Sequence, residues 1–258
     1  MVKGIDAAAS GMIGMMSMND IISNNLANIN TPGFKQSIAT FQSFKDVMVS
    51  KIDASNGYTQ STGESLGTLS TGSAINQTAL DFKQGSLQVT GNPTDLALQG
   101  QGFFEIQTPN GIAYTRNGSF IRNDKAELTT TDGYHVIGRN GPITLNNNND
   151  FSNVKITEDG TVEINNKIID KINIVDFKNK ANLQSIGTSL YAPINGEKPV
   201  AATNCTVKDG ALESSNSNVI ECMVNSINAS RTYESLSKVI DSNNKSLNHA
   251  VNEVGRIR

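Results

Sequence analysis

The sequence is poor in the residue types that usually carry catalysis, metal binding or covalent cross-links. Among 258 residues there are no tryptophans, two histidines and two cysteines. Two cysteines exclude a disulfide framework and a cysteine-based zinc cluster. One bridge between Cys205 and Cys222 remains an alternative, but two unpaired thiols are favoured, because Cys205 falls in a polar stretch and Cys222 in a helical pattern.

The net charge does not favour nucleic-acid binding, and the apolar runs are too short for membrane insertion. The formal net charge is -3, and a chain without a basic excess is not a general nucleic-acid binder. No apolar run approaches the roughly 20 residues that span a bilayer, so no membrane insertion is expected. Asp6, Ser10 and Asp20 interrupt the apolar N-terminus, which therefore is not a cleaved secretion signal. The chain stays in the cytosol or leaves by a route that reads no cleaved signal.

Motifs for catalysis, cofactors and metals are not found in the sequence. His135 and His249 have no ligand at metal spacing, and both are expected to be structural or exposed. Gly100 and Gly102 resemble part of a dinucleotide fingerprint, but Glu105 occupies the third glycine position and the segment opens a strand. A phosphate-binding loop and a nucleophile elbow are also missing. We predict no enzyme activity, no cofactor and no metal.

An enzyme on a β scaffold, such as a carbohydrate hydrolase, is an alternative of another class. It would need a convergent carboxylate pair, whereas Asp81, Asp95 and Glu105 are scattered over β-like segments. Arg116 offers an anion site. An arginine beside Asn-Gly in a hairpin, however, more often bonds a carbonyl or a carboxylate locally.

At the start of the chain, apolar residues recur with the seven-residue period of a coiled coil. One series consists of Ile5, Met12, Asn19 and Leu26, and the second of Ala8, Met15, Ile22 and Ile29. Pro32 disfavours helix at the residue before it, and Gly33 suits a turn, so the helix should end near Asn30.

The end of the chain repeats this pattern. No glycine or proline occurs between Ala211 and Val254, which permits a helix of about 35 residues. One series of seven consists of Val219, Ser226, Tyr233, Ile240, Leu247 and Val254. The other consists of Met223, Ser230, Ser237, Asn244 and Val251.

The two helices either pack on each other within one molecule or assemble with other subunits. A seam that carries several serines and an asparagine makes a weak two-helix pair, which favours assembly with several neighbours. The expected contact residues are Ile5, Met12, Met15, Asn19, Ile22, Leu26, Val219, Met223, Tyr233, Ile240 and Leu247.

Between the helices the sequence predicts β structure. Short alternating runs are separated by Asn-Gly and Asp-Gly pairs from about residue 66 to residue 207, which is typical of a sandwich or a barrel-like domain. Phe34, Ile38, Phe41, Phe44 and Met48 suit a short helix, and residues 55–73 read as an extended or flexible linker. The predicted fold is α+β. An N-terminal helix (1–33), a linker (34–80), a central all-β domain (81–210) and a C-terminal helix (211–258) follow one another, and the helices form a coiled-coil-like domain.

Several blocks of the sequence resemble the bacterial flagellar rod and hook protein family. Residues 23–35 read SNNLANINTPGFK, residues 91–104 read GNPTDLALQGQGFF, residues 114–120 read YTRNGSF and residues 212–216 read LESSN. Residues 223–224, 231–234 and 238–240 continue the C-terminal signature. The residues that carry the resemblance are Asn24, Asn25, Leu26, Ala27, Asn28, Pro32, Gly33, Phe34, Arg116, Gly118, Arg231 and Glu234.

The resemblance covers nearly the whole chain and implies a function. Members of this family leave the cell through the flagellar type III export apparatus without signal cleavage and polymerise into the periplasmic axis of the basal body. The resemblance implies a rod subunit that forms a helical homopolymer, contacts other rod and hook proteins and the surrounding rings, and passes motor torque to the hook. The length is closest to the rod subunits, because hook proteins are usually longer.

Two other readings stay open at this stage. A hook protein or another axial protein would share the same motifs. A secreted β-rich adhesion or binding module would explain the centre of the chain, but it would not need helices at both termini.

Overall fold

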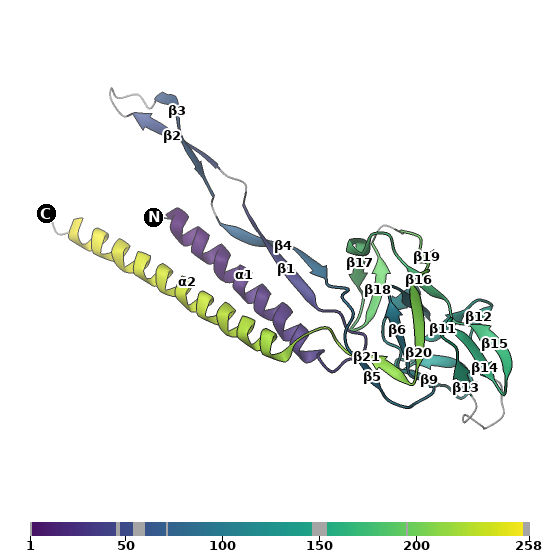
Figure 1. Ribbon diagram of the computed structural model, residues 1–258. Helices are drawn as coiled ribbons and strands as arrows, with labels where there is room; N and C mark the ends of the chain where they lie inside the picture. Colours follow the sequence, from purple (N-terminus) through teal and green to yellow (C-terminus); the bar gives the residue numbers. More distant parts are fainter. Residues whose placement is uncertain are drawn as a thin grey trace. The chain divides into compact units, whose positions relative to one another are not determined.

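The computed structural model describes residues 2–44, 47–53, 60–70, 72–145, 154–194 and 196–254. The chain divides into two compact units. The helical unit comprises Met1–Asn24, Ile38–Ala79 and Ile220–Arg258, and the β unit comprises Asn25–Ser37 and Leu80–Val219. Terminal helices and a β-rich centre confirm the predicted α+β class (Figure 1).

Two antiparallel helices form the core of the helical unit. Helix α1 spans Val2–Ala27, and α2 spans Val219–Val254. The Ser226 hydroxyl donates a hydrogen bond of 2.8 Å to Asn19 Oδ1, and a Cβ on Gly11 would lie 3.0 Å from Leu236 Cδ1. With these contacts the last turns of α2 extend past the start of α1, because α2 has 36 residues and α1 has 26.

The chain from Ser37 to Leu80, most of which belongs to the helical unit, forms β strands, so the predicted short helix there is wrong. Strand β1 (Ser37–Ser43) pairs with β4 (Ser73–Leu80), and β2 (Val47–Asp53) pairs antiparallel with β3 (Gln60–Leu69). A Cβ on Gly14 would lie 2.8 Å from Phe41 Cε1, so this glycine admits the aromatic ring against α1. Pairing with β4, and not apolar spacing alone, therefore decides the extended conformation of residues 37–43. Strand β3 occupies much of the stretch expected as a linker (55–73), and residues 55–59 and 71 of that stretch lie outside the described part.

The β unit is built from short strands. They are β5 (Leu87–Val89), β6 (Leu96–Gly100), β7 (Phe103–Thr108), β8 (Gly111–Thr115), β9 (Phe120–Arg122), β10 (Leu128–Thr130), β11 (His135–Gly138), β12 (Gly141–Pro142), β13 (Val154–Ile156), β14 (Thr161–Ile164), β15 (Lys167–Lys171), β16 (Ile174–Asp176), β17 (Leu183–Ser185), β18 (Leu190–Pro193), β19 (Val200–Ala201), β20 (Cys205–Asp209) and β21 (Ala211–Glu213). A short 3-10 helix spans Lys180–Asn182.

The main sheet follows the order β17-β18-β8-β7-β11-β10-β9, with β12, β16 and β19 paired off this path. Strands β7 and β8 form the central hairpin, in which Phe104 lies opposite Thr115. Smaller sheets consist of β13-β14-β15, of β20 with β6 and of β21 with β5. Strands β5 and β21 both belong to the β unit and pair with each other, so the segment just before α2 is part of this unit.

Two apolar clusters fill the β unit. The larger contains Leu96, Leu98, Phe104, Ile106, Ala113, Phe120, Leu128, Val136, Ile143, Leu145, Ile156, Val162, Ile172 and Val207. The smaller is mostly aromatic and contains Phe103, Tyr114, Val175, Phe177, Leu183 and Tyr191. Phe103 packs edge-on against Phe177 and Tyr191, with ring centroids 5.9 Å apart in both pairs. This double core gives the unit a closed interior.

Candidate assembly site

The predicted seam of α1 is divided between buried and partly exposed positions. Ala8 and Ile22 are buried. Met15 and Asn19 line a groove against α2. Ile5, Met12 and Leu26 are half-buried. The next position along the helix from Met12, Ile13, is 65% exposed, so α1 also presents apolar surface away from the seam.

On α2 only one of the two predicted series lies on the side that contacts α1. Tyr233, Ile240 and Leu247 are half-buried there, together with two buried residues that the series does not contain, Cys222 and Ala229. The second predicted series is displaced by one residue from this inner side. Met223, which begins it, is 51% exposed. Val219, which begins the first series at the start of α2, is also exposed.

A groove lies between the two helices. It has a volume of about 370 Å³. Its lining residues are Met15, Met16, Asn19, Ala229, Ser230, Tyr233 and Glu234. Methionine and tyrosine supply apolar walls, and Glu234 places a carboxylate in the lining.

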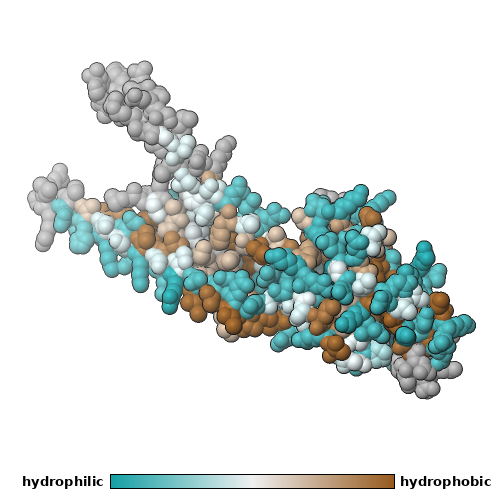
Figure 2. Space-filling model, viewed as in Figure 1, coloured by the Kyte–Doolittle hydropathy of each residue, from teal (hydrophilic) through white to brown (hydrophobic). Residues whose placement is uncertain are grey.

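The outer side of α2 carries an apolar stripe at helical spacing, formed by Ile220, Met223, Val224 and Ile227. Each is at least half exposed, and Ile220 is 73% exposed. Figure 2 shows hydrophobic surface gathered over these first turns of α2. Exposed apolar patches of this kind mark interaction sites.

Three charged residues from distant parts of the chain meet inside the β unit. Lys35 Nζ lies 2.6 Å from Glu213 Oε1, and Arg116 Nη1 lies 3.2 Å from Glu213 Oε2. All three side chains are essentially excluded from solvent. Arg116 also donates to the carbonyl of Gly100 at 2.8 Å, and its guanidinium lies 5.3 Å from the centre of the Phe103 ring. Arg116 thus bonds a carbonyl and a carboxylate, as expected, but both partners are distant in the sequence and not local.

This cluster is structural in character. Burial lowers the pKa of Lys35, and the neighbouring Glu213 carboxylate opposes that effect. Lys35 also donates to the carbonyl of Lys83 at 2.6 Å, and Glu213 accepts from the backbone of Gly85 at 2.9 Å. The cluster therefore ties the chain that follows α1 to the chain that precedes α2. Breaking a buried pair of this kind costs about 3–5 kcal/mol.

Two motif glycines permit the close packing around this cluster. Gly33 has a φ of +68°, and a Cβ there would lie 2.3 Å from the backbone of Arg116. A Cβ on Gly118 would lie 1.7 Å from the carbonyl oxygen of Leu96. Both positions exclude any side chain, and the Gly33 amide donates to the Glu213 carbonyl at 2.7 Å.

The remaining motif residues after α1 organise the turn into β1. The Asn25 side chain donates to the Ser37 carbonyl at 2.8 Å and accepts from its amide at 2.9 Å. Phe34 is buried, Pro32 and Asn28 are half-buried, and Asn24 and Ala27 are exposed. Asn216 likewise accepts from the Gln36 amide at 2.8 Å. The sequence analysis did not single out Lys35, Glu213 or Asn216, although all three fall within the quoted motif blocks.

The three carboxylates considered in the sequence, those of Asp81, Asp95 and Glu105, each accept a hydrogen bond from a different partner, and none of these bonds joins two of them. Asp81 accepts from the Lys83 amide, Asp95 from the Thr90 hydroxyl, and Glu105 from the Asn173 side chain. His249 is exposed on α2, and His135 Nδ1 lies 3.4 Å from Glu127. No group of three or more possible metal ligands occurs among the described residues, and both cysteines are free thiols, as favoured.

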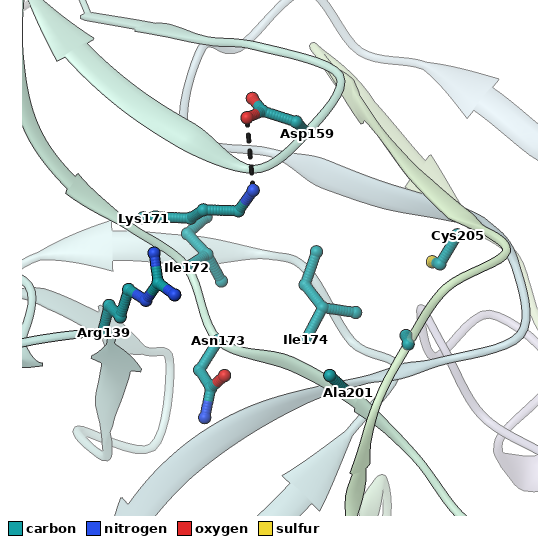
Figure 3. A pocket seen from close by; sticks show the side chains of 9 residues that line it. Arg139, Asp159, Lys171, Ile172, Asn173, Ile174, Ala201 and Cys205 are labelled. Carbon is teal, nitrogen blue, oxygen red and sulfur yellow. Dashed lines mark hydrogen bonds and ion pairs between the residues drawn. The ribbon is translucent and has the colours of Figure 1, made fainter.

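One pocket in the β unit, of about 380 Å³, has a polar rim (Figure 3). Lys171 and Asp159 pair at 3.2 Å in its lining, Arg139 also lines it, and Ile172 and Cys205 contribute apolar lining. Hydroxyls of nearby threonines and Lys171 lower the pKa of Asp159, whereas burial raises the pKa of Cys205. This thiol is therefore kept protonated, which does not favour a nucleophilic role.

No helix in the described part of the chain has the length and apolarity to span a membrane. Comparison with protein families gives matches in three segments. They are a flagella basal body rod protein family at residues 5–35, the FlgE/F/G hook protein D1 domain at residues 97–164, and the C-terminal family of FlgEFG basal body rod proteins at residues 208–253.

Individual relatives match over nearly the whole length. The flagellar basal-body rod protein FlgG of Bacillus subtilis is 35% identical, over 98% of this chain and 99% of that protein. FlgG of Borreliella burgdorferi is 34% identical over 98% of each chain. The flagellar hook-basal body complex protein FlhO of Bacillus subtilis is 31% identical over the full length of both.

Within the family, two parts of the sequence favour different rod proteins. From these motifs we predict FlgG over FlgF: residues 141–145 are more typical of FlgF, whereas residues 100–104 and the C-terminal block are at least as typical of FlgG. The relatives at 33–35% identity are FlgG proteins, in agreement with the second indication. The chain belongs to the flagellar basal-body rod protein family and is FlgG-like.

Proposed function

We propose that this chain is a structural subunit of the flagellar basal-body rod and that it polymerises through its two terminal helices. The observation that carries the proposal is the outer stripe of α2, whose large apolar side chains are exposed in the single chain. Burial of such apolar surface is the dominant favourable contribution to most protein–protein association. Membership of a rod family supplies the assembly in which the burial takes place.

In this assembly the helices pack in a coiled-coil-like manner with those of other copies. Two features of the single chain support this: the fully buried positions on the inner side of α2 are the small residues Cys222 and Ala229, and α1 retains exposed Ile13 and Met16. A bundle with several neighbours covers both the inner and the outer side of α2. The predicted contact residues, from Ile5 to Leu247, form the proposed interface together with the outer stripe.

The β2–β3 ribbon supports the same conclusion. It is a two-stranded antiparallel pair of seven and ten residues, joined to the rest of the unit through β1 and β4. Isolated two-stranded ribbons are marginally stable in water. The ribbon therefore gains most of its stability from contacts with neighbouring subunits in the rod.

The proposed setting follows from these contacts and from the family. The subunit leaves the cell through the flagellar type III export apparatus without signal cleavage and joins the rod in the periplasm. Its partners are further copies of itself, adjoining rod and hook proteins, and the surrounding ring proteins. Its role is mechanical and not catalytic: interlocked helices resist bending and so pass torque to the hook.

Deletion of the gene, followed by electron microscopy of purified basal bodies, tests the proposal. We expect basal bodies with an incomplete rod and no hook, and recovery of both when the intact gene is supplied in trans. A deletion strain that keeps a complete rod and loses only the hook would favour a hook protein. A strain that keeps the rod and the hook would overturn the rod assignment.

A further inference from the structure

The two helices hold most of the methionines of this chain. Five of the seven methionines lie in α1 or α2, and four of these stand within residues 12–18 of α1. Methionine is flexible, and its polarisable thioether suits apolar contact surfaces of irregular shape. Unlike an aliphatic side chain, it is also oxidised to a polar sulfoxide. The five residues are Met12, Met15, Met16, Met18 and Met223.

Two of these methionines are open to solvent in the single chain. Met16 is 57% exposed, and Met223 is 51% exposed. Met12, Met15 and Met18 are half-buried. Because susceptibility to oxidation follows exposure, an oxidant dissolved in water reaches Met16 and Met223 first.

Both exposed methionines belong to one side of the helix pair. Met16 lines the groove between α1 and α2 together with Ser230 and Glu234 of α2. Met223 precedes Ser230 by seven residues and Glu234 by eleven, so these three side chains share one face of α2. The exposed Ile227 lies between them on that face. A polar group on either methionine therefore enters the apolar surface that the proposed assembly buries.

We propose that Met16 and Met223 are modification sites at which a peroxide controls assembly of the subunit. Hydrogen peroxide transfers one oxygen atom to the thioether sulfur: the O–O bond breaks, an S–O bond forms, the sulfur loses two electrons, and the peroxide is reduced to water. The sulfoxide oxygen is a hydrogen-bond acceptor, and its burial without a donor opposes the packing of a second copy. The inference rests on the proposed function. An oxidised subunit stays outside the rod, whereas a subunit already assembled is shielded from the oxidant.

The two cysteines are poor competitors for the peroxide. Cys222 is buried, and burial raises the pKa of both the Cys205 and the Cys222 thiols. Peroxides react with thiolates, so thiols that stay protonated react slowly. A loss of assembly caused by peroxide should therefore trace to methionine.

Oxidative footprinting tests the two sites. Purified monomer and purified rods receive the same dose of hydrogen peroxide, and mass spectrometry of peptides locates the sulfoxides. In the monomer, Met16 and Met223 should be oxidised before Met12 and Met18. In rods, the oxidation of Met16 and Met223 should be at least about fivefold lower than in the monomer, because neighbouring copies cover them. Equal oxidation of these two residues in monomer and rod would overturn the inference, as would earlier oxidation of Met12 and Met18.

Leucine variants test the consequence for assembly. Cells that produce the protein with Met16→Leu and Met223→Leu should form complete rods in the usual number, because leucine keeps the apolar volume. A sublethal dose of hydrogen peroxide during assembly should reduce complete rods at least about fivefold with the native protein and leave this double variant unaffected. Met12→Leu with Met18→Leu is the matched control and should remain as sensitive as the native protein. Equal sensitivity of the Met16→Leu and Met223→Leu double variant would overturn the inference.

Glutamine variants imitate the oxidised state without peroxide. Met16→Gln with Met223→Gln places polar side chains of similar length at both sites and should give the same loss of complete rods. Rods in the usual number from this variant would contradict the inference.

These outcomes separate the inference from the proposed function. If deletion of the gene removes the rod but the leucine and native proteins are equally sensitive to peroxide, the inference fails and the rod assignment stands. If the deletion strain keeps its rods, both fail together.

Discussion

The two units of this chain bury their apolar residues to very different extents. Among the described residues of the helical unit the buried ones are Ala8, Gly14, Ile22, Cys222 and Ala229, of which Ile22 alone is a large aliphatic residue. The β unit buries two apolar clusters and an ionic cluster of three side chains. A unit with a closed core is stable by itself, whereas a unit with apolar stripes outside depends on neighbours.

This contrast assigns different tasks to the two units. The β unit sets the path of the chain, because Lys35 and Glu213 clamp the segments that lead out of α1 and into α2. In the proposed rod the helical unit supplies the surfaces that meet other copies. The predictions below test this division between the two units.

The largest effect is expected from a carboxylate placed among the helices. Ile22→Asp or Ile240→Asp should abolish rod assembly and leave the β unit folded, because an unpaired charge in packed apolar surface costs at least several kcal/mol. Motility assays and electron microscopy measure assembly, and circular dichroism of the secreted subunit measures folding. Thr232→Asp, at an exposed position, is the control. A misfolded or degraded protein would indicate that the helices pair only within the monomer, and normal motility would place the seam on another face.

The next effect concerns the clamp, by which we mean the buried ionic cluster of Lys35, Arg116 and Glu213 in the β unit. Glu213→Ala leaves Lys35 and Arg116 buried without their carboxylate and should lower the free energy of unfolding by about 3–5 kcal/mol. Chemical denaturation of the full chain measures this value. Asp241→Ala removes a carboxylate from an exposed pair and should cause no measurable change.

An apolar replacement of the clamp sharpens this result. Lys35→Met, Arg116→Met and Glu213→Leu together should recover most of the loss, because no charge is then left buried without a partner. A triple variant as unstable as Glu213→Ala would show that the hydrogen bonds to the backbone, and not the charges, hold the clamp.

Amide hydrogen exchange compares the two units directly. In the dilute monomer, amides of α1 and α2 should exchange at least about a hundredfold faster than those of β7 and β8, because helices that leave most of their large apolar side chains exposed gain little stability from packing. In assembled rods the difference should shrink. Strong protection throughout residues 5–26 and 219–251 of the monomer would contradict the dependence of the helices on neighbours.

Local sequence patterns account for much of the fold. The seven-residue periods predicted both terminal helices, with ends at Ala27 and Val254 close to those expected. Asn-Gly and Asp-Gly pairs predicted the hairpins, and Gly111 and Gly133 have the positive φ that such turns require. These features depend on neighbours along the chain, which a single sequence displays.

Features set by distant partners were not predicted. Strand β1 was expected to be helical, because the apolar spacing around Phe41 suits a helix as well as a strand. Only its pairing with the distant strand β4 decides for the strand. The second series on α2 was displaced by one residue from the inner side, because the helix is apolar on two sides and periodicity does not distinguish them. Lys35 and Glu213 stand 178 residues apart, and no local pattern connects them.

The smallest predicted effect appears at alkaline pH. Burial raises the pKa of Tyr191 above its ordinary value of 10.0. Above that pH the unfolded chain releases the phenolic proton while the folded β unit retains it, so the free energy of unfolding falls as the pH rises. Tyr191→Phe removes this contribution and should make the fall between about pH 10 and 11 shallower, by at most about 1.4 kcal/mol per pH unit.

Lys35 acts in the opposite direction in the same range. Its pKa is lowered by burial, so the unfolded chain holds this proton longer, and stability rises with pH up to about its ordinary value of 10.5. The comparison between the intact protein and Tyr191→Phe keeps Lys35 in both and isolates the tyrosine. The free energies of unfolding of the two proteins, measured by denaturation and plotted against pH, should differ in slope above pH 10 and run parallel between about pH 7 and 9. Equal slopes above pH 10 would show that the folded β unit admits the ionised phenol, and hence that its aromatic cluster is less closed than its packing indicates.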